Sequence, residues 1–228
     1  DHVIMQGAGP EICVVSTKAA LSQMVILLRI VLELALLEGT MTPSESKKNE
    51  LALSQLPGAI EQIVNERSGL IHRLAHQHCG IEHWLYLGRG IYYPIARESA
   101  LKMKEVSYLH AEGMPGGFLK HGTLSLISPE FCSVIFVPSP REEKLYELTL
   151  CSAEEVKARG GFLIGFRFDD SRLEAGLFDE EIVLHVMPEL IGPFAQLVVA
   201  QLFAYFTATA LRRDVDKPRA LAKSVTVP

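Results

Sequence analysis

Residues 84–90 read WLYLGRG, an apolar run that ends in two glycines flanking an arginine. A short run of this kind is typical of a buried strand, and the glycines predict a tight turn directly after it. A helical pattern follows at Pro94–Leu109, so the stretch predicts a strand, a glycine turn and a helix in that order. This is the layout that places ligands at the carboxyl ends of parallel strands.

The same alternation continues toward the C-terminus. Strand patterns occur at 132–137, 162–166 and 182–186, and helical patterns at 142–158 and 191–211. Strands that alternate with helices favour parallel β-α-β units with right-handed crossovers. We therefore predict one complete α/β unit with a parallel sheet over about residues 80–211.

The residues before this unit are predicted to be mainly helical. Val3–Gln6 resembles the end of a strand, and Thr17–Leu37 is a long apolar helix. Its apolar run, Met24–Leu37, is too short for a bilayer and carries two charges, so we expect a buried core helix. Two amphipathic helices are expected to follow, Ser44–Leu56 and Pro57–His76, because proline is tolerated in a first helical turn.

Composition limits the classes of function. Hydrophobic residues make up 48% and charged residues 21% of the 228 residues, a mixture typical of a chain that buries a core. The net charge of −5 gives no basic footprint for nucleic acid. The four cysteines form no C-x-x-C pair, which favours reduced thiols in a cytoplasmic protein.

The helix predicted at Pro94–Leu109 carries Glu98, Lys102 and Glu105 on one face, at positions i, i+4 and i+7. Spacing alone favours a solvated helix face. The alternative is a carboxylate base with an ammonium group beside it, suited to proton abstraction. The apolar residues on the other sides of the helix favour this second interpretation somewhat.

Two other segments are candidates for chemistry. His110–Gly122 contains glycines and a proline among charged residues, which predicts a loop, and a histidine in such a loop is a plausible acid or base. Gly9–Lys18 ends a strand pattern and opens a helix. There, Ser16 or Thr17 caps the helix, or backbone N–H groups bind a ligand oxygen.

Two further patterns are weaker. A group of potential zinc ligands is interpreted as solvated side chains, because no matching carboxylate or cysteine pair completes a site; it comprises His72, His76, His78, Cys79 and His83. Gly88-Arg89-Gly90 lacks the third glycine of a dinucleotide fingerprint. We expect neither a metal nor a cofactor.

Longer motifs give the sequence a specific resemblance. Together they closely resemble the glutamine:fructose-6-phosphate amidotransferase family, also called glucosamine-6-phosphate synthase, over essentially the whole chain. The motifs are GRG at 88–90, YPIA at 93–96, ALKMKE at 100–105, SYLHAE at 107–112, LKHG at 119–122, EEVKARGG at 154–161, DVDKPR at 214–219, LAKSVTV at 221–227, AGPE at 8–11 and STKA at 16–19.

The resemblance implies a fold and a division of the chain. It implies a sugar-isomerase (SIS) type three-layer αβα sandwich with a parallel sheet, preceded by the helical remnant of a second SIS unit. The implied domains are the remnant at 1–42, a helical connector at 43–79, the second SIS domain at 80–211 and a tail over the sugar at 212–228. We expect an N-terminally truncated chain, because the family's phosphate loops and glutaminase domain would precede residue 1.

The resemblance also implies a reaction, in which fructose 6-phosphate and ammonia from glutamine give glucosamine 6-phosphate. Glu105 would move the proton between C1 and C2, and Lys102 would stabilise the developing enolamine charge. His121 would assist ring opening in the site of a neighbouring subunit, and Lys223 would form a Schiff base with the ketone. The residues implied to contact the sugar are Val14, Ser16 and Ala222.

The implied partners are the sugar phosphates, a glutaminase domain of the same enzyme and a second copy in a homodimer, with neither nucleic acid nor a membrane involved. The chain departs from the family at Phe118, where a glutamate is usual, at Ala220 in place of an asparagine and at Pro228 in place of a terminal glutamate.

Two alternatives are a related fructosamine-phosphate deglycase or isomerase, and a non-catalytic sugar-phosphate-binding SIS module. The tail with Lys223 argues against the first. Retention of the implied base, cations and histidine together argues against the second.

Overall fold

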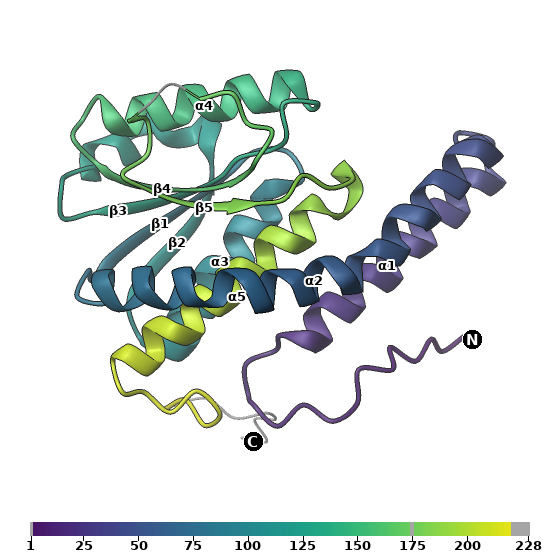
Figure 1. Cartoon of the computed structure of the whole chain (residues 1–228), viewed down its shortest axis with the longest axis horizontal. Coiled ribbons are helices and arrows are strands. Elements are labelled where there is room, and N and C mark those ends of the chain that lie inside the picture. Colours follow the sequence, from purple (N-terminus) through teal and green to yellow (C-terminus); the bar gives the residue numbers. More distant parts are fainter. Residues whose placement is uncertain (1, 174–175, 220–228) are drawn as a thin grey trace.

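A computed structural model describes residues 2–173 and 176–219. Over these residues the strands form a five-stranded parallel sheet in the order β2-β1-β3-β4-β5 (Figure 1). The strands are β1 (His83–Gly88), β2 (His110–Pro115), β3 (Cys132–Phe136), β4 (Phe162–Phe168) and β5 (Glu180–Leu184). The predicted parallel α/β sheet is therefore confirmed. The strand order changes direction at β1, because β2 is added on one side of β1 and β3, β4 and β5 are added on the other.

Helices cover both faces of this sheet (Figure 1). One face is covered by α4 (Glu143–Lys157), and the other by α3 (Tyr92–Ser107), α5 (Gly192–Ala210) and part of α2 (Pro43–His78). Alternate residues of β1 enter the two cores, with Trp84 and Tyr86 on the α3–α5 side and Leu85 and Leu87 on the α4 side. A strand buried on both faces is continuously apolar, which explains the run that begins at residue 84.

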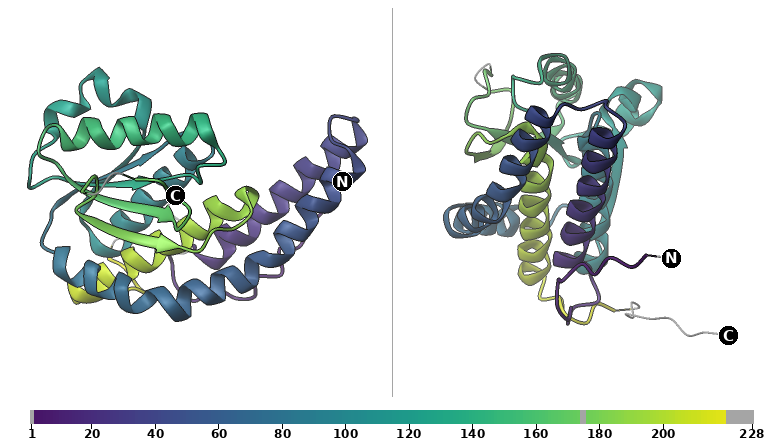
Figure 2. Two further views of the ribbon diagram at one scale, coloured as in Figure 1. Left: turned by 45° about the horizontal axis from the view of Figure 1, so that its top comes forward. Right: turned by 90° about the vertical axis from the view of Figure 1, so that its right-hand side faces the viewer.

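Helices α1 (Lys18–Leu37) and α2 form a long hairpin that projects away from the sheet (Figure 2). Gly39 takes a positive φ of 68° at the end of α1. Thr42 and Glu45 then form a capping box that starts α2: the Glu45 amide donates to the Thr42 hydroxyl at 3.2 Å, and the Thr42 amide donates to the Glu45 carboxylate at 2.8 Å.

The expectation that Met24–Leu37 is a buried core helix is wrong for the described chain. No residue of α1 is fully buried, and Leu27, Val31 and Leu37 are 62%, 59% and 80% exposed. The reason is that α1 packs along α2 on one side only, as Figures 1 and 2 show.

By length and composition alone, two helical stretches among the described residues could span a membrane: Lys18–Leu37, with none of its apolar window buried, and Glu189–Ala210, with 72% of it buried. Core helices of globular proteins pass the same test, so this observation carries little weight.

Two other predictions, a helix boundary and a strand, are also wrong. Helix α2 continues through Pro57 instead of breaking there, because Leu56, Ile60 and Ile63 on its apolar side pack against other helices and hold both halves in line. Val3–Gln6 forms no strand in the described chain, because no neighbouring strand pairs with it, and its apolar side chains are exposed.

The glycine-rich segment His110–Gly122, predicted as a loop, is partly regular. It contains the edge strand β2, followed by the 3₁₀ turns η1 (Gly116–His121) and η2 (Thr123–Leu126); a third such turn, η3 (Glu189–Ile191), precedes α5. Gly113 allows this strand to lie against α3, since a Cβ there would be 2.4 Å from the Cα of Arg97.

His185, just after β5, lies in an acidic contact between β5 and α2. Its ring nitrogens lie 3.0 Å from Asp169 and 3.1 Å from Glu66, and these hydrogen bonds, that to Asp169 foremost, raise the pKa of His185. Protonated His185 therefore stabilises the folded chain at a pH below its unfolded pKa, and this contribution is lost as the pH rises through the folded pKa.

We expect a proton NMR titration of His185 to show a pKa above the usual histidine value, lowered by Glu66→Gln and by Asp169→Asn. Glu61→Gln, an exposed change on the same helix, is the control and should leave the titration unchanged. The effect on stability is small because His185 is half-exposed. An ordinary pKa that neither variant changes would contradict the contact.

Candidate functional site

The candidate site is built on the last turns of α3. The ammonium of Lys102 lies 2.7 Å from the carboxylate of Glu105 and 3.2 Å from that of Glu98, so one cation bridges both acids. Lys102 is only 4% exposed, while the carboxylates remain partly open to solvent. The interpretation of this face as merely solvated is therefore wrong, because α3 packs against the sheet and beside α5, and many residues of α3 are buried.

A buried lysine is costly unless it is paired, and here both pairs lie on its own helix. The arrangement holds one carboxylate, Glu105, at a fixed position beside an ammonium group. A carboxylate can accept a proton from carbon, and the adjacent cation can stabilise negative charge that develops on the substrate.

Helix α3 ends at Tyr108, which takes a left-handed conformation with φ 66°. The Tyr108 hydroxyl accepts a hydrogen bond from the backbone N–H of Arg219 at 2.7 Å. The guanidinium groups of Arg213 and Arg219 lie over its ring at 5.2 and 4.4 Å. Tyr108 therefore anchors the start of the tail one turn beyond Glu105. Sequence reasoning missed this role, although the aromatic residue directly follows the helix.

The segment before α1 meets the same part of the tail. The Cys13 thiol donates to the Val215 carbonyl at 2.7 Å, and the Val14 amide donates to the Asp216 carbonyl at 3.3 Å. Val15 is buried in the core that also holds Val106 of α3. Three stretches far apart in sequence, around residues 13–15, 105–108 and 213–219, therefore converge at one end of the molecule.

The N-terminus of α1 is capped differently from the prediction. Neither Ser16 nor Thr17 provides a side-chain cap. Instead Glu11 accepts the backbone N–H of Thr17 at 2.8 Å, and its other oxygen lies 3.5 Å from the Ser16 hydroxyl. A carboxylate at this position also interacts favourably with the helix dipole.

His121 lies elsewhere in the chain. It ends η1 after the carboxyl end of β2, whereas Glu105 lies near the amino ends of the strands, because α3 runs antiparallel to β1 and β2. The described chain therefore does not bring His121 to Glu105. Both His121 and Phe118 are exposed, and their rings meet edge to face at 5.7 Å.

Lys223 and Ala222 lie outside the described residues. Among the described residues no group of three or more His, Cys, Asp and Glu side chains is arranged to hold a metal ion.

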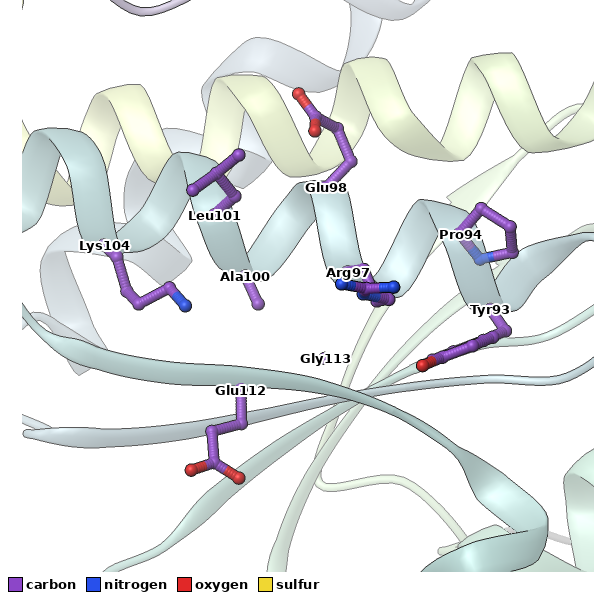
Figure 3. Close-up of a pocket in the computed structure, with 9 residues that line it drawn as sticks. All are labelled: Tyr93, Pro94, Arg97, Glu98, Ala100, Leu101, Lys104, Glu112 and Gly113. Atoms are coloured by element: carbon purple, nitrogen blue, oxygen red, sulfur yellow. The ribbon is translucent and has the colours of Figure 1, made fainter.

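A separate groove of about 570 Å³ runs between α3 and the edge strand β2 (Figure 3). Tyr93, Arg97 and Lys104 point toward β2, while Glu98 points away from it (Figure 3). Of the three charged residues of the candidate site, Glu98 is counted in the lining of the groove, whereas Lys102 and Glu105 are not.

Known proteins resemble this chain in sequence and in fold. Residues 81–211 match the SIS domain family model. Curated relatives named glutamine–fructose-6-phosphate aminotransferase (isomerizing) include one from Gloeobacter violaceus, 42% identical over 96% of this chain, and one from Caldanaerobacter subterraneus, 37% identical over all of it. The chain spans 36% and 37% of the lengths of these two relatives, respectively.

Among solved structures, the C-terminal domain of glucosamine-fructose-6-phosphate aminotransferase from Francisella tularensis superimposes with a TM-score of 0.85 at 34% identity, over 92% of this chain and 58% of that one. A putative tagatose-6-phosphate ketose/aldose isomerase from Clostridium novyi, with a TM-score of 0.70 over 81% of this chain and 49% of that one, shares the fold at 18% identity. The parallel sheet, its flanking helices and the matched residues together show that this chain belongs to the SIS domain family.

Proposed function

We propose that this chain is the isomerase part of a glutamine–fructose-6-phosphate aminotransferase, which forms glucosamine 6-phosphate from fructose 6-phosphate and ammonia released from glutamine. The observation that carries the proposal is the buried Lys102 held between Glu98 and Glu105, at the end of α3 where residues 13–15 and the start of the tail converge. The similarity to relatives with this printed name supports it.

The proposed sequence begins with ring opening assisted by His121. The C2–O5 bond breaks, O5 takes a proton and the C2 hydroxyl loses one, which leaves a ketone at C2. Lys223 forms a Schiff base with this ketone, whose oxygen leaves as water, and ammonia then displaces the lysine to leave an imine at C2. Glu105 then removes a proton from C1 and returns one to C2, while Lys102 stabilises the enolamine charge.

We propose that the working enzyme is an assembly of at least two copies. Val14, Ser16 and Ala222 would contact the sugar. Because His121 and Glu105 lie at opposite ends of the parallel strands, a neighbouring copy would supply the histidine, so the working form would be at least a homodimer. We also propose that residues 80–211 form the second of two SIS domains. A connector at 43–79 would join this domain to the remnant of the first SIS domain at 1–42, and residues 212–228 would form a tail. The proposed location of the enzyme is the cytoplasm.

The test is a chimera in which this chain replaces the matching 36% of the Gloeobacter violaceus relative. We expect the chimera to form glucosamine 6-phosphate from fructose 6-phosphate and glutamine. The unmodified relative is the positive control, and circular dichroism and glutaminase activity show whether the chimera has folded. A folded chimera that binds fructose 6-phosphate but forms no product would instead support a non-catalytic binding module.

A further inference from the structure

Arg89 lies in the turn after β1 and makes a contact with α4 across the sheet end. Its side chain is half-buried, and its Nε and Nη2 donate to the hydroxyl of Ser152 on α4 at 3.2 and 2.8 Å. Ser152 is fully buried. No ion pair of Arg89 with a carboxylate is found among the described residues, so a neutral hydroxyl fixes this cation.

The same hydroxyl connects to the start of η1, the turn that carries His121. Ser152 Oγ lies 3.3 Å from the carbonyl oxygens of Gly116 and Leu148, either of which accepts its proton. Arg89, Ser152 and Gly116 therefore form a chain of contacts that joins the β1 turn, α4 and η1.

The glycine pair at 116–117 makes this contact possible. A Cβ on Gly116 would lie 2.9 Å from Ser152 Oγ and 3.2 Å from Arg89 Nε, and a Cβ on Gly117 would lie 3.2 Å from Arg89 Nη1. The Arg89 guanidinium thus lies directly against the backbone that leads to His121.

Two other contacts hold η1, one apolar and one an exposed ion pair. Leu119 is fully buried in the α4-side core and anchors the middle of the turn. Lys120 pairs with Glu155 of α4 at 2.9 Å, but Lys120 is 68% exposed, so the pair contributes little. The Arg89–Ser152–Gly116 chain is a polar link to η1 whose central hydroxyl is fully buried.

We infer that Arg89 is a positioning residue for His121, acting through Ser152 and the backbone of Gly116 and Gly117 to fix the His121-bearing turn. This inference rests on the ring-opening role proposed above for His121. Displacing a catalytic group by about 1 Å can cost on the order of 100-fold in rate. Loss of Arg89 is therefore expected to impair ring opening specifically.

The test uses two substrates, of which one must undergo ring opening and the other is always open. Fructose 6-phosphate closes through O5, whereas 5-deoxyfructose 6-phosphate has no 5-hydroxyl and cannot close a ring. In the chimera, Arg89→Met should lower kcat/KM for fructose 6-phosphate by about 10- to 100-fold and that for the 5-deoxy analogue by less than about threefold. Ser152→Ala should show the same selectivity more weakly, and His121→Asn should show it fully.

Arg73→Met, which removes an exposed arginine on α2, is the matched control and should affect neither substrate. An equal loss on both substrates, or no loss, would overturn the positioning role. If the unsubstituted chimera turned over neither substrate, the proposed function would have failed instead. Hydrogen exchange of the full chain then decides the structural part: Arg89→Met should accelerate exchange at residues 116–122 relative to Arg73→Met, and equal exchange would refute it.

Discussion

Replacing Glu105 with glutamine is expected to lower the rate of isomerisation by about 1,000-fold, within the range known for loss of a general base. Glutamine has the same shape as glutamate but accepts no proton from C1. Lys102 keeps its contact to Glu98 in this variant, so the helix end should stay folded. Binding of fructose 6-phosphate is therefore expected to change by less than about threefold. The reason is that Glu105 accepts the proton only in the transition state, so its loss does not weaken binding of the substrate.

Glu98→Gln is the matched control, because Glu98 lies on the same helix and contacts the same ammonium at 3.2 Å. We expect less than about a tenfold loss of rate, since Glu98 would support Lys102 without moving a proton. Both variants are measured in the chimera by kcat for glucosamine 6-phosphate, by calorimetric binding and by washout of deuterium from C1. Equal losses in the two variants, or deuterium washout that persists with Glu105→Gln, would refute the assignment of the base.

The sheet could be predicted from local sequence because its strands are buried on both faces. The run at 84–87 has no polar position, and the same holds for most of β3 and β4, so a continuous apolar pattern marks each strand. Strand β2 lacks that signal, since Gly113 and Pro115 read as a loop. It is a strand because β1 pairs with it and α3 covers it, and both are tertiary facts.

In the helical hairpin of α1 and α2 the local pattern predicted burial that the structure does not show. The apolar residues of α1 predict burial, but burial depends on what lies alongside. In the described chain α2 lies along α1, and a small cluster with Ile191 and Phe194 covers the first turns of α1, so the rest of its apolar surface stays exposed. Likewise Pro57 locally favours a helix boundary, but packing of α2 on both sides of Pro57 overrides that preference and the helix continues.

The candidate site could be predicted in part. The spacing of Glu98, Lys102 and Glu105 placed them on one face, and the ion pairs of Lys102 with both acids agree with that geometry. Burial of the ammonium could not be read from spacing, because it depends on the packing of α3 against the sheet and α5. The contacts of Arg89 and Tyr108 depend on segments about 60 and 110 residues away, beyond the range of any local pattern.

Lys102→Met should affect both stability and catalysis. Methionine fills similar space among the buried neighbours of Lys102, but it leaves Glu98 and Glu105 near each other without the cation between them. Because both carboxylates are partly solvated, we expect a loss of about 1–3 kcal/mol in the free energy of unfolding, the usual cost of unpairing a buried polar group. Urea unfolding of the chain measures this.

The catalytic effect of Lys102→Met is expected to be larger than the stability loss explains. A donor aimed at developing negative charge contributes about 100- to 1,000-fold to kcat, so the rate should fall by about that factor at a temperature where the variant is fully folded. Lys104→Met, on the exposed side of the same helix and without an ion pair among the described residues, should change neither quantity. If folded Lys102→Met kept its rate within about threefold, Lys102 would contribute to folding alone, and charge stabilisation would have to come from another group.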